Sequence, residues 1–242
     1  MRQSSKNQPT LVQLEIEAAA KTYAKNVKQT PSDNLTDSVN LTDSVIKKIE
    51  KDISKELLAM KKKDEISEAL YTRLRSTGVQ PSRLYGLAKV HKQGTPLRPV
   101  LSLPGSSYDQ LNKTLAKYFD EIEGANIETN TQMAKENLEK TELDSDESII
   151  SLDVKSLYAN VPLKEALEIA LRRLYEQVNP PETFRKTMKK LLNLAVSKLQ
   201  CKCNGLWYVQ KDGIAMGASL AVILANLWLK EYEPALKKKY QN

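Results

Sequence analysis

A stretch of sixteen residues without a charge, residues 214–229, interrupts a chain in which 28% of the residues are charged. A helix that crosses a membrane needs about 20 consecutive apolar residues. This stretch is shorter, and it contains Gly217, Ser219 and Asn226. We therefore expect a helix buried in the core of a globular domain, beginning near Gly217 and ending near Lys230, and no membrane partner.

The composition is that of a globular protein. The 242 residues suffice for one large domain or two modest ones, and hydrophobic residues make up 40%. Two cysteines exclude a disulfide scaffold, and one histidine excludes a His-rich metal site. The first 30 residues contain no apolar segment typical of a secretion signal, so we expect an intracellular protein, in the nucleus or the cytoplasm.

The net charge of +7 is unevenly distributed. Residues 61–100 carry +6, residues 101–150 carry −7 and residues 151–242 carry +7. Basic surfaces attract phosphate backbones, so the two basic blocks are compatible with a nucleic-acid partner. A solvated charged surface explains either block equally well.

Helices are expected to outnumber strands. A helix is expected to begin at an N-cap within residues 42–44 and to run to about residue 63. The spacing of apolar residues and the positions of prolines predict further helices over residues 11–27, 64–76, 108–122, 162–177 and 181–199.

Strands are expected at three places. Residues 84–87 and 98–101 flank a turn at Gly94, and residues 148–154 form an apolar run that contains Asp153. Residues 201–210 read as a hairpin around Asn204-Gly205, the strongest two-residue turn signal. The pattern predicts an α+β fold, mostly helical, with a small antiparallel sheet.

Asp153 is the residue with the most chemical interest in this pattern. A carboxylate at the end of a buried strand is costly unless it is paired. It either caps the following turn or binds a metal ion, and the segment alone leaves both possibilities open.

Four segments together identify a family resemblance. They are residues 82–92 (SRLYGLAKVHK), 96–100 (PLRPV), 151–162 (SLDVKSLYANVP) and 213–226 (GIAMGASLAVILAN). In this order and spacing they resemble the reverse transcriptases of Penelope-like retroelements and, more widely, the fingers and palm of RNA-directed DNA polymerases. The resemblance covers residues 64–230. It implies an N-terminal helical extension (1–63), a fingers-like region (64–147) and a partial palm (148–242).

The resemblance also implies partners and catalytic residues. Asp153 matches the strand carboxylate that binds catalytic Mg²⁺, with the Val154 carbonyl as a second oxygen ligand. Tyr158 matches the aromatic residue beneath the sugar of the incoming deoxynucleoside triphosphate. Arg98 matches the arginine that grips the triphosphate, and Lys89 is expected to help hold it. The implied polymer partners are an RNA template and a DNA primer.

Further positions are implied to contact nucleotide or nucleic acid. Met216 and Gly217 match the loop beneath the primer and template, where a missing side chain allows close backbone approach. Lys92, Arg83 and Asn226 match positions near the nucleic acid. Each residue also has a structural reading: a core aromatic at Tyr158, a surface ion pair at Arg98, solvated lysines and a turn at Gly217.

The chain departs from the family in one important respect. The family supplies further metal-binding carboxylates from an Asp-Asp pair after the uncharged helix, and the 242 residues contain no Asp-Asp dipeptide. The segment Tyr118-Phe119-Asp120-Glu121 precedes Asp153 and has helical spacing, so it is not the missing pair. We therefore expect a truncated reverse transcriptase domain that is inactive alone.

Two alternatives stay open at this stage. One is a non-catalytic, basic nucleic-acid-binding protein. The other is a helical interaction protein in which the matching segments are accidental.

Overall fold

The computed structural model describes residues 27–29, 38–76, 80–90, 93–123, 131–142, 149, 154 and 156–240. The helices are α2 (Ser38–Lys62), α3 (Glu68–Leu74), α4 (Asp109–Glu123), α5 (Thr131–Lys140), α6 (Leu157–Asn160), α7 (Leu163–Val178), α8 (Glu182–Val196) and α9 (Ser219–Tyr240). The strands are β1 (Val27–Gln29), β2 (Arg83–Ala88), β3 (Leu97–Ser102), β4 (Gln200–Cys203) and β5 (Leu206–Gln210). The fold is α+β and mainly helical, as the sequence predicts.

The five strands form one sheet in the order β1-β5-β4-β2-β3. β2 and β3 form an antiparallel hairpin in which Arg83 lies opposite Ser102 and Leu87 opposite Arg98. β2 and β4 run parallel and meet at Arg83 and Lys202. The sheet is therefore mixed rather than purely antiparallel, because two distant hairpins join through this one pair.

The β4–β5 hairpin confirms the turn predicted from its sequence. Asn204 and Gly205 have φ angles of +47° and +81°. Two successive positive φ angles match the twist of the flanking strands, and Asn-Gly adopts them at low cost.

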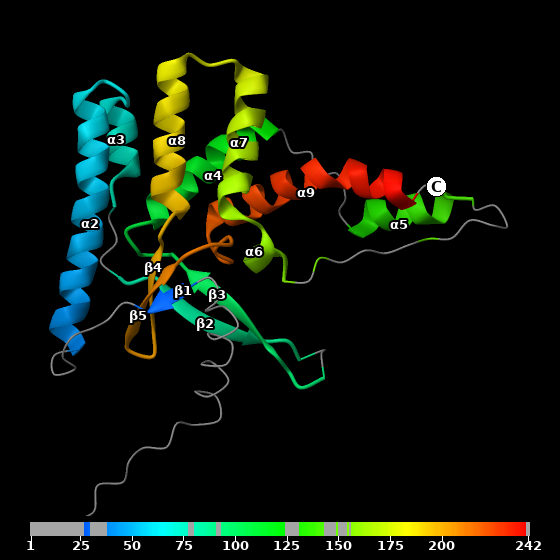
Figure 1. Ribbon diagram of the computed structural model, residues 1–242, viewed down its shortest axis with the longest axis horizontal. Helices are drawn as coiled ribbons and strands as arrows, with labels where there is room; N and C mark the ends of the chain where they lie inside the picture. Colours follow the sequence, from blue (N-terminus) through cyan, green and yellow to red (C-terminus); the bar gives the residue numbers. More distant parts are fainter. Residues whose placement is uncertain are drawn as a thin grey trace, which may run out of the picture.

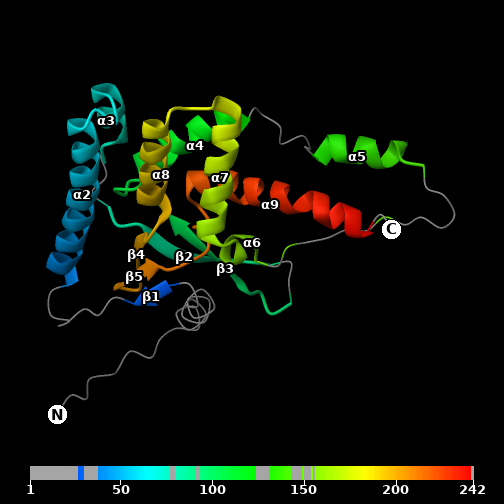
Figure 2. The same ribbon diagram turned by 45° about the horizontal axis from the view of Figure 1, so that its top comes forward.

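α4, α7, α8 and the start of α9 lie together on one side of the sheet, as Figures 1 and 2 show. α9 packs against α4 and α7, and α8 packs against α4 and α7 as well. In both views α2 stands at one end of the molecule and α5 at the other. Leu84 and Leu101 from the sheet join the helices in one hydrophobic core.

α9 accounts for the uncharged stretch. Leu220, Ala221, Leu224, Ala225 and Leu227 are all buried in the core, as expected for a core helix. Among the described residues, no helix is both long enough and apolar enough to span a membrane. α9 extends to Tyr240, ten residues beyond the expected end, and includes Pro234.

Several helix boundaries differ from the sequence predictions. α2 begins at Ser38, so residues 42–44 lie inside the helix and do not cap it. α3 spans only Glu68–Leu74, because the Ser67 side chain caps it by accepting a hydrogen bond from the Leu70 amide. α5 was not anticipated. The segment 118–121 lies within α4, and the Phe119 side chain is buried.

Two predicted elements fall largely outside the described residues. Of the helix predicted over residues 11–27, only Val27 is described, and it begins β1. Of the strand predicted over residues 148–154, only Ile149 and Val154 are described. Both are exposed and belong to no helix or strand. Asp153 lies outside the described residues.

Candidate functional site

The loop that precedes α9 lies against the free edge of the sheet. The Leu101 amide of β3 donates a hydrogen bond of 2.7 Å to the Met216 carbonyl. Gly217 follows with a φ of +104°, and a Cβ atom there would lie 2.7 Å from the Leu101 carbonyl oxygen. Glycine is required at this position by both the backbone angle and the close approach of β3.

The same loop is bonded to the helix that carries Tyr158. The Ile214 amide donates a hydrogen bond of 2.7 Å to the Tyr158 carbonyl in α6. The Tyr158 ring is half-buried and packs against the core. Residues 214–217 therefore connect α6 to β3, two elements separated by more than fifty residues.

Asp212 and Gln210 fix the start of this loop. Asp212 Oδ1 accepts hydrogen bonds from the Leu163 amide at 3.0 Å and from the Gly213 amide at 2.8 Å. The buried Gln210 Nε2 donates to the Gly213 carbonyl at 2.7 Å. α7 begins after Pro162, which has no side chain that can cap it, so Asp212 acts as a long-range cap for α7.

Arg98 lies on β3, the same strand as Val100 and Leu101, which Gly217 faces. Because side chains alternate along a strand, Arg98 and Val100 share one face of β3. Val100 Cγ1 lies 3.0 Å from the position of a Cβ atom on Gly217. Arg98 is exposed and three residues from Leu101, a separation of about 10 Å along the strand. The structure thus brings together Tyr158, the Met216-Gly217 loop and the strand of Arg98.

The other predicted positions are more dispersed. Lys89 is half-buried just after β2, where its amide donates to the Pro96 carbonyl at 3.0 Å. Arg83 begins β2. It lies four residues before Leu87, the residue opposite Arg98, so Arg83 and Arg98 are separated by about 13 Å along the hairpin. Asn226 lies in the middle of α9, seven residues after its start, and Lys92 lies outside the described residues.

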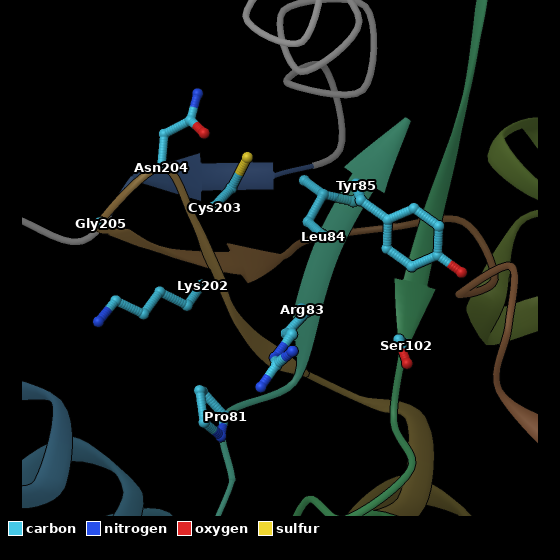
Figure 3. Close-up of a pocket in the computed structure, with 9 residues that line it drawn as sticks. All are labelled: Pro81, Arg83, Leu84, Tyr85, Ser102, Lys202, Cys203, Asn204 and Gly205. Atoms are coloured by element: carbon cyan, nitrogen blue, oxygen red, sulfur yellow. The ribbon is translucent and has the colours of Figure 1, made fainter. Parts of the chain in front are cut away.

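Arg83 contributes to a pocket of about 530 Å³ at the meeting point of the two hairpins. Its wall includes Tyr85 and Ser102 from the β2–β3 hairpin, and Lys202 and Asn204 from the β4–β5 hairpin. Figure 3 shows Arg83 extending from β2 toward Pro81 and the Tyr85 ring lying over β3. The sequence does not predict that Tyr85 and Lys202 line one pocket, because only the parallel pairing of β2 with β4 brings their strands together.

The described residues do not provide a metal cage. No group of three His, Cys, Asp or Glu side chains gathers anywhere in the described ranges. Val154, predicted to supply a carbonyl ligand, is exposed and lies outside any helix or strand. Asp153, the carboxylate predicted to bind Mg²⁺, lies outside the described residues.

The two cysteines lie on one face of β4, and both are buried. Burial raises the pKa of the Cys201 thiol to about 12, with a smaller contribution from the neighbouring Cys203. Because thiolates rather than thiols bind metals, this buried pair fits a packing role.

Comparison with known proteins gives one family match. A family model described as reverse transcriptase (RNA-dependent DNA polymerase) matches residues 90–242, more than half of the chain. No curated protein and no solved structure matches the chain significantly.

Proposed function

The chain belongs to the reverse transcriptase family, and we propose that it forms the fingers and part of the palm of an enzyme of the Penelope-like retroelement type. The reaction of such an enzyme joins the primer 3′ oxygen to the α-phosphorus of a deoxynucleoside triphosphate and releases pyrophosphate. In this proposal the template is RNA and the primer is DNA.

One observation carries the proposal: residues 214–217 connect Tyr158 to the strand of Arg98 through two backbone hydrogen bonds of 2.7 Å. We propose that Arg98, with Lys89, holds the triphosphate, since a guanidinium matches phosphate geometry. Tyr158 lies beneath the sugar, and Met216 and Gly217 lie beneath the base pair. Lys92, Arg83 and Asn226 contact nucleic acid.

The proposed regions are an N-terminal extension (1–63), fingers (64–147) and partial palm (148–242). The sheet joins strands from all three regions, since β1, the β2–β3 hairpin and the β4–β5 hairpin are contiguous in it. An intracellular site of action, in the nucleus or the cytoplasm, is compatible with two cysteines that form no disulfide.

We propose that Asp153, with the Val154 carbonyl, is the part of the Mg²⁺ site that these 242 residues contain. The Asp-Asp pair of the family is not among them. The polypeptide is therefore proposed to bind substrates without turning them over. The alternative is a non-catalytic basic protein that binds only nucleic acid, and the basic segments 61–100 and 151–242 are compatible with it.

The test is the affinity of the 242-residue chain for a deoxynucleoside triphosphate, measured by titration calorimetry. We expect Arg98→Ala to weaken binding at least about tenfold, because a hydrogen-bonded charge pair contributes about 1.5–3 kcal/mol. The affinity of Arg98→Lys is expected to lie between those of the unsubstituted chain and Arg98→Ala, since lysine keeps the charge but loses the planar fork. Arg73→Ala, at an exposed arginine on α3, is the matched control. Equal affinities for the chain and Arg98→Ala would contradict the proposal.

A further inference from the structure

The outward side of α2 carries a row of lysines. With about 3.6 residues per turn, five exposed lysines of this helix fall within one sector of about 100° around its axis. These residues, called here the lysine row, are Lys47, Lys48, Lys51, Lys55 and Lys62. The opposite side of α2 packs into the core through five buried apolar residues, Ile46, Ile49, Ile53, Leu57 and Met60. The row therefore lies on the side of α2 that no other element covers.

The lysine row is not balanced by acidic side chains. Glu50, Asp52 and Glu56 of the same helix lie outside its sector. None of the five lysines forms an ion pair with another residue that the structure describes. Lysines four residues apart repel one another and destabilise a helix, so an anion bound along the row would remove an unfavourable contact.

The row is separate from the candidate triphosphate site. Figures 1 and 2 show α2 at one end of the molecule. The core that joins α2 to the sheet lies on the side of the helix opposite to the row. A partner bound to the row would therefore leave Arg98 and Tyr158 unoccupied.

The length and composition of the row fit a nucleic-acid duplex. Lys47 and Lys62 are fifteen residues apart, which is about 22 Å along the helix. Duplex DNA carries one negative charge per about 1.7 Å of its axis, so phosphates are available along the whole row. Proteins that hold unpaired bases stack them on aromatic rings, and α2 contains no aromatic residue. A partner contacted only through its backbone, a duplex, fits better than a single strand.

An anionic membrane surface fits the row less well. A helix that binds a membrane surface buries its apolar face among the lipids. In α2 that face is already buried in the core, and Leu58, at 37%, is the exposed one among its described large apolar side chains.

We propose that the lysine row of α2 binds the phosphate backbone of a nucleic-acid duplex without reading its sequence. The contact goes beyond the proposed function, which places the triphosphate at Arg98 and the sugar at Tyr158. It gives the chain a second, purely electrostatic hold on nucleic acid, at the far side of the core from the sheet.

The test measures binding of a fluorescent blunt DNA duplex of about 20 base pairs to the full 242-residue chain, by anisotropy at several salt concentrations. The variant combines Lys47→Gln, Lys51→Gln and Lys55→Gln, because glutamine removes the charge and keeps the helix propensity. We expect its affinity at about 0.1 M salt to fall at least about tenfold. The slope of log affinity against log salt should decrease by about 2–3, since each contact to a duplex phosphate contributes about 0.9.

A second triple variant is the matched control. Lys135→Gln, Lys140→Gln and Lys238→Gln remove the same charge from exposed lysines of α5 and α9, and should leave the slope unchanged. Thermal unfolding checks the fold of both variants. We expect the α2 variant to melt no lower than the unsubstituted chain, because the repulsion within the row is reduced. Lys51→Gln alone, a milder change, should decrease the slope by about 0.9.

Two results with the duplex would overturn the proposal: an affinity and slope that the α2 variant does not change, or an equal loss in both triple variants. Binding to phosphatidylserine vesicles that is lost in the α2 variant, with duplex binding unchanged, would overturn it in favour of a lipid surface. Titration with a deoxynucleoside triphosphate separates this proposal from the proposed function. If Arg98→Ala leaves triphosphate binding unchanged while duplex binding depends on the row, only the proposed triphosphate site fails.

Discussion

At Gly217 a single residue type decides whether the candidate site can form. Its φ of +104° is strained for any L side chain, and the Leu101 carbonyl oxygen would lie 2.7 Å from a Cβ atom. The Leu101 carbonyl belongs to the backbone of β3 and cannot rotate away as a flexible side chain could. The loop that carries Met216 can therefore lie against β3 only with glycine at this position.

We expect Gly217→Ala to lower the free energy of unfolding by about 3 kcal/mol, through backbone strain and the clash together. Gly94→Ala is the matched control, because Gly94 also has a positive φ but has open space around it. We expect it to cost about 1 kcal/mol. Urea unfolding of both variants measures the difference, and equal losses would show that β3 does not constrain Gly217.

At the scale of elements, side chains far apart in the sequence hold helices in place. Asp212 caps α7 from 49 residues away, and the buried Gln210 bonds the adjoining Gly213 carbonyl. Farther along the same helix, Arg172 and Arg173 form ion pairs with Glu231 of α9. The Arg172 hydrogen bond lowers the pKa of the Glu231 carboxyl. These bonds fix α7 relative to both the loop and α9.

We expect Asp212→Ala to lower the free energy of unfolding by about 1–2 kcal/mol, since it removes an acceptor from two amides. Asp212→Asn keeps an oxygen acceptor at the same position and should cost less than about half as much. Thermal or urea unfolding distinguishes the two variants. If Asp212→Ala unfolds like the unsubstituted chain, the cap contributes nothing.

At the scale of the whole molecule, binding and catalysis have different requirements. Binding needs cations and an accessible sheet face, and β2 and β3 provide both. Two-metal phosphoryl transfer needs several carboxylates around two ions, and the Asp-Asp pair that would supply them in the proposed type of enzyme is not among the 242 residues.

We therefore expect the 242-residue polypeptide to give no detectable Mg²⁺-dependent primer extension on an RNA template. The preparation used must bind the DNA duplex and the triphosphate, so that inactivity cannot be attributed to misfolding. Measurable extension that depends on Mg²⁺ and is lost in Asp153→Asn would show that this chain holds a sufficient metal site.

The sequence alone determined the features that depend on interactions between residues close together in the chain. The Asn204-Gly205 turn, the β2–β3 hairpin and the buried start of α9 follow from local backbone preference and from apolar spacing, and the structure confirms all three. The glycine at 217 also stood out in the sequence, because it precedes the uncharged helix.

Only the tertiary structure decided how these pieces meet. The parallel contact of Arg83 with Lys202, the bond from Leu101 to Met216 and the cap from Asp212 to α7 join residues more than forty positions apart. No periodicity records such pairings, since they follow from the packing of whole elements around one core. For that reason Arg98 and Tyr158 could be named from the sequence, whereas the pocket of Tyr85 and Lys202 and the cap from Asp212 required the fold.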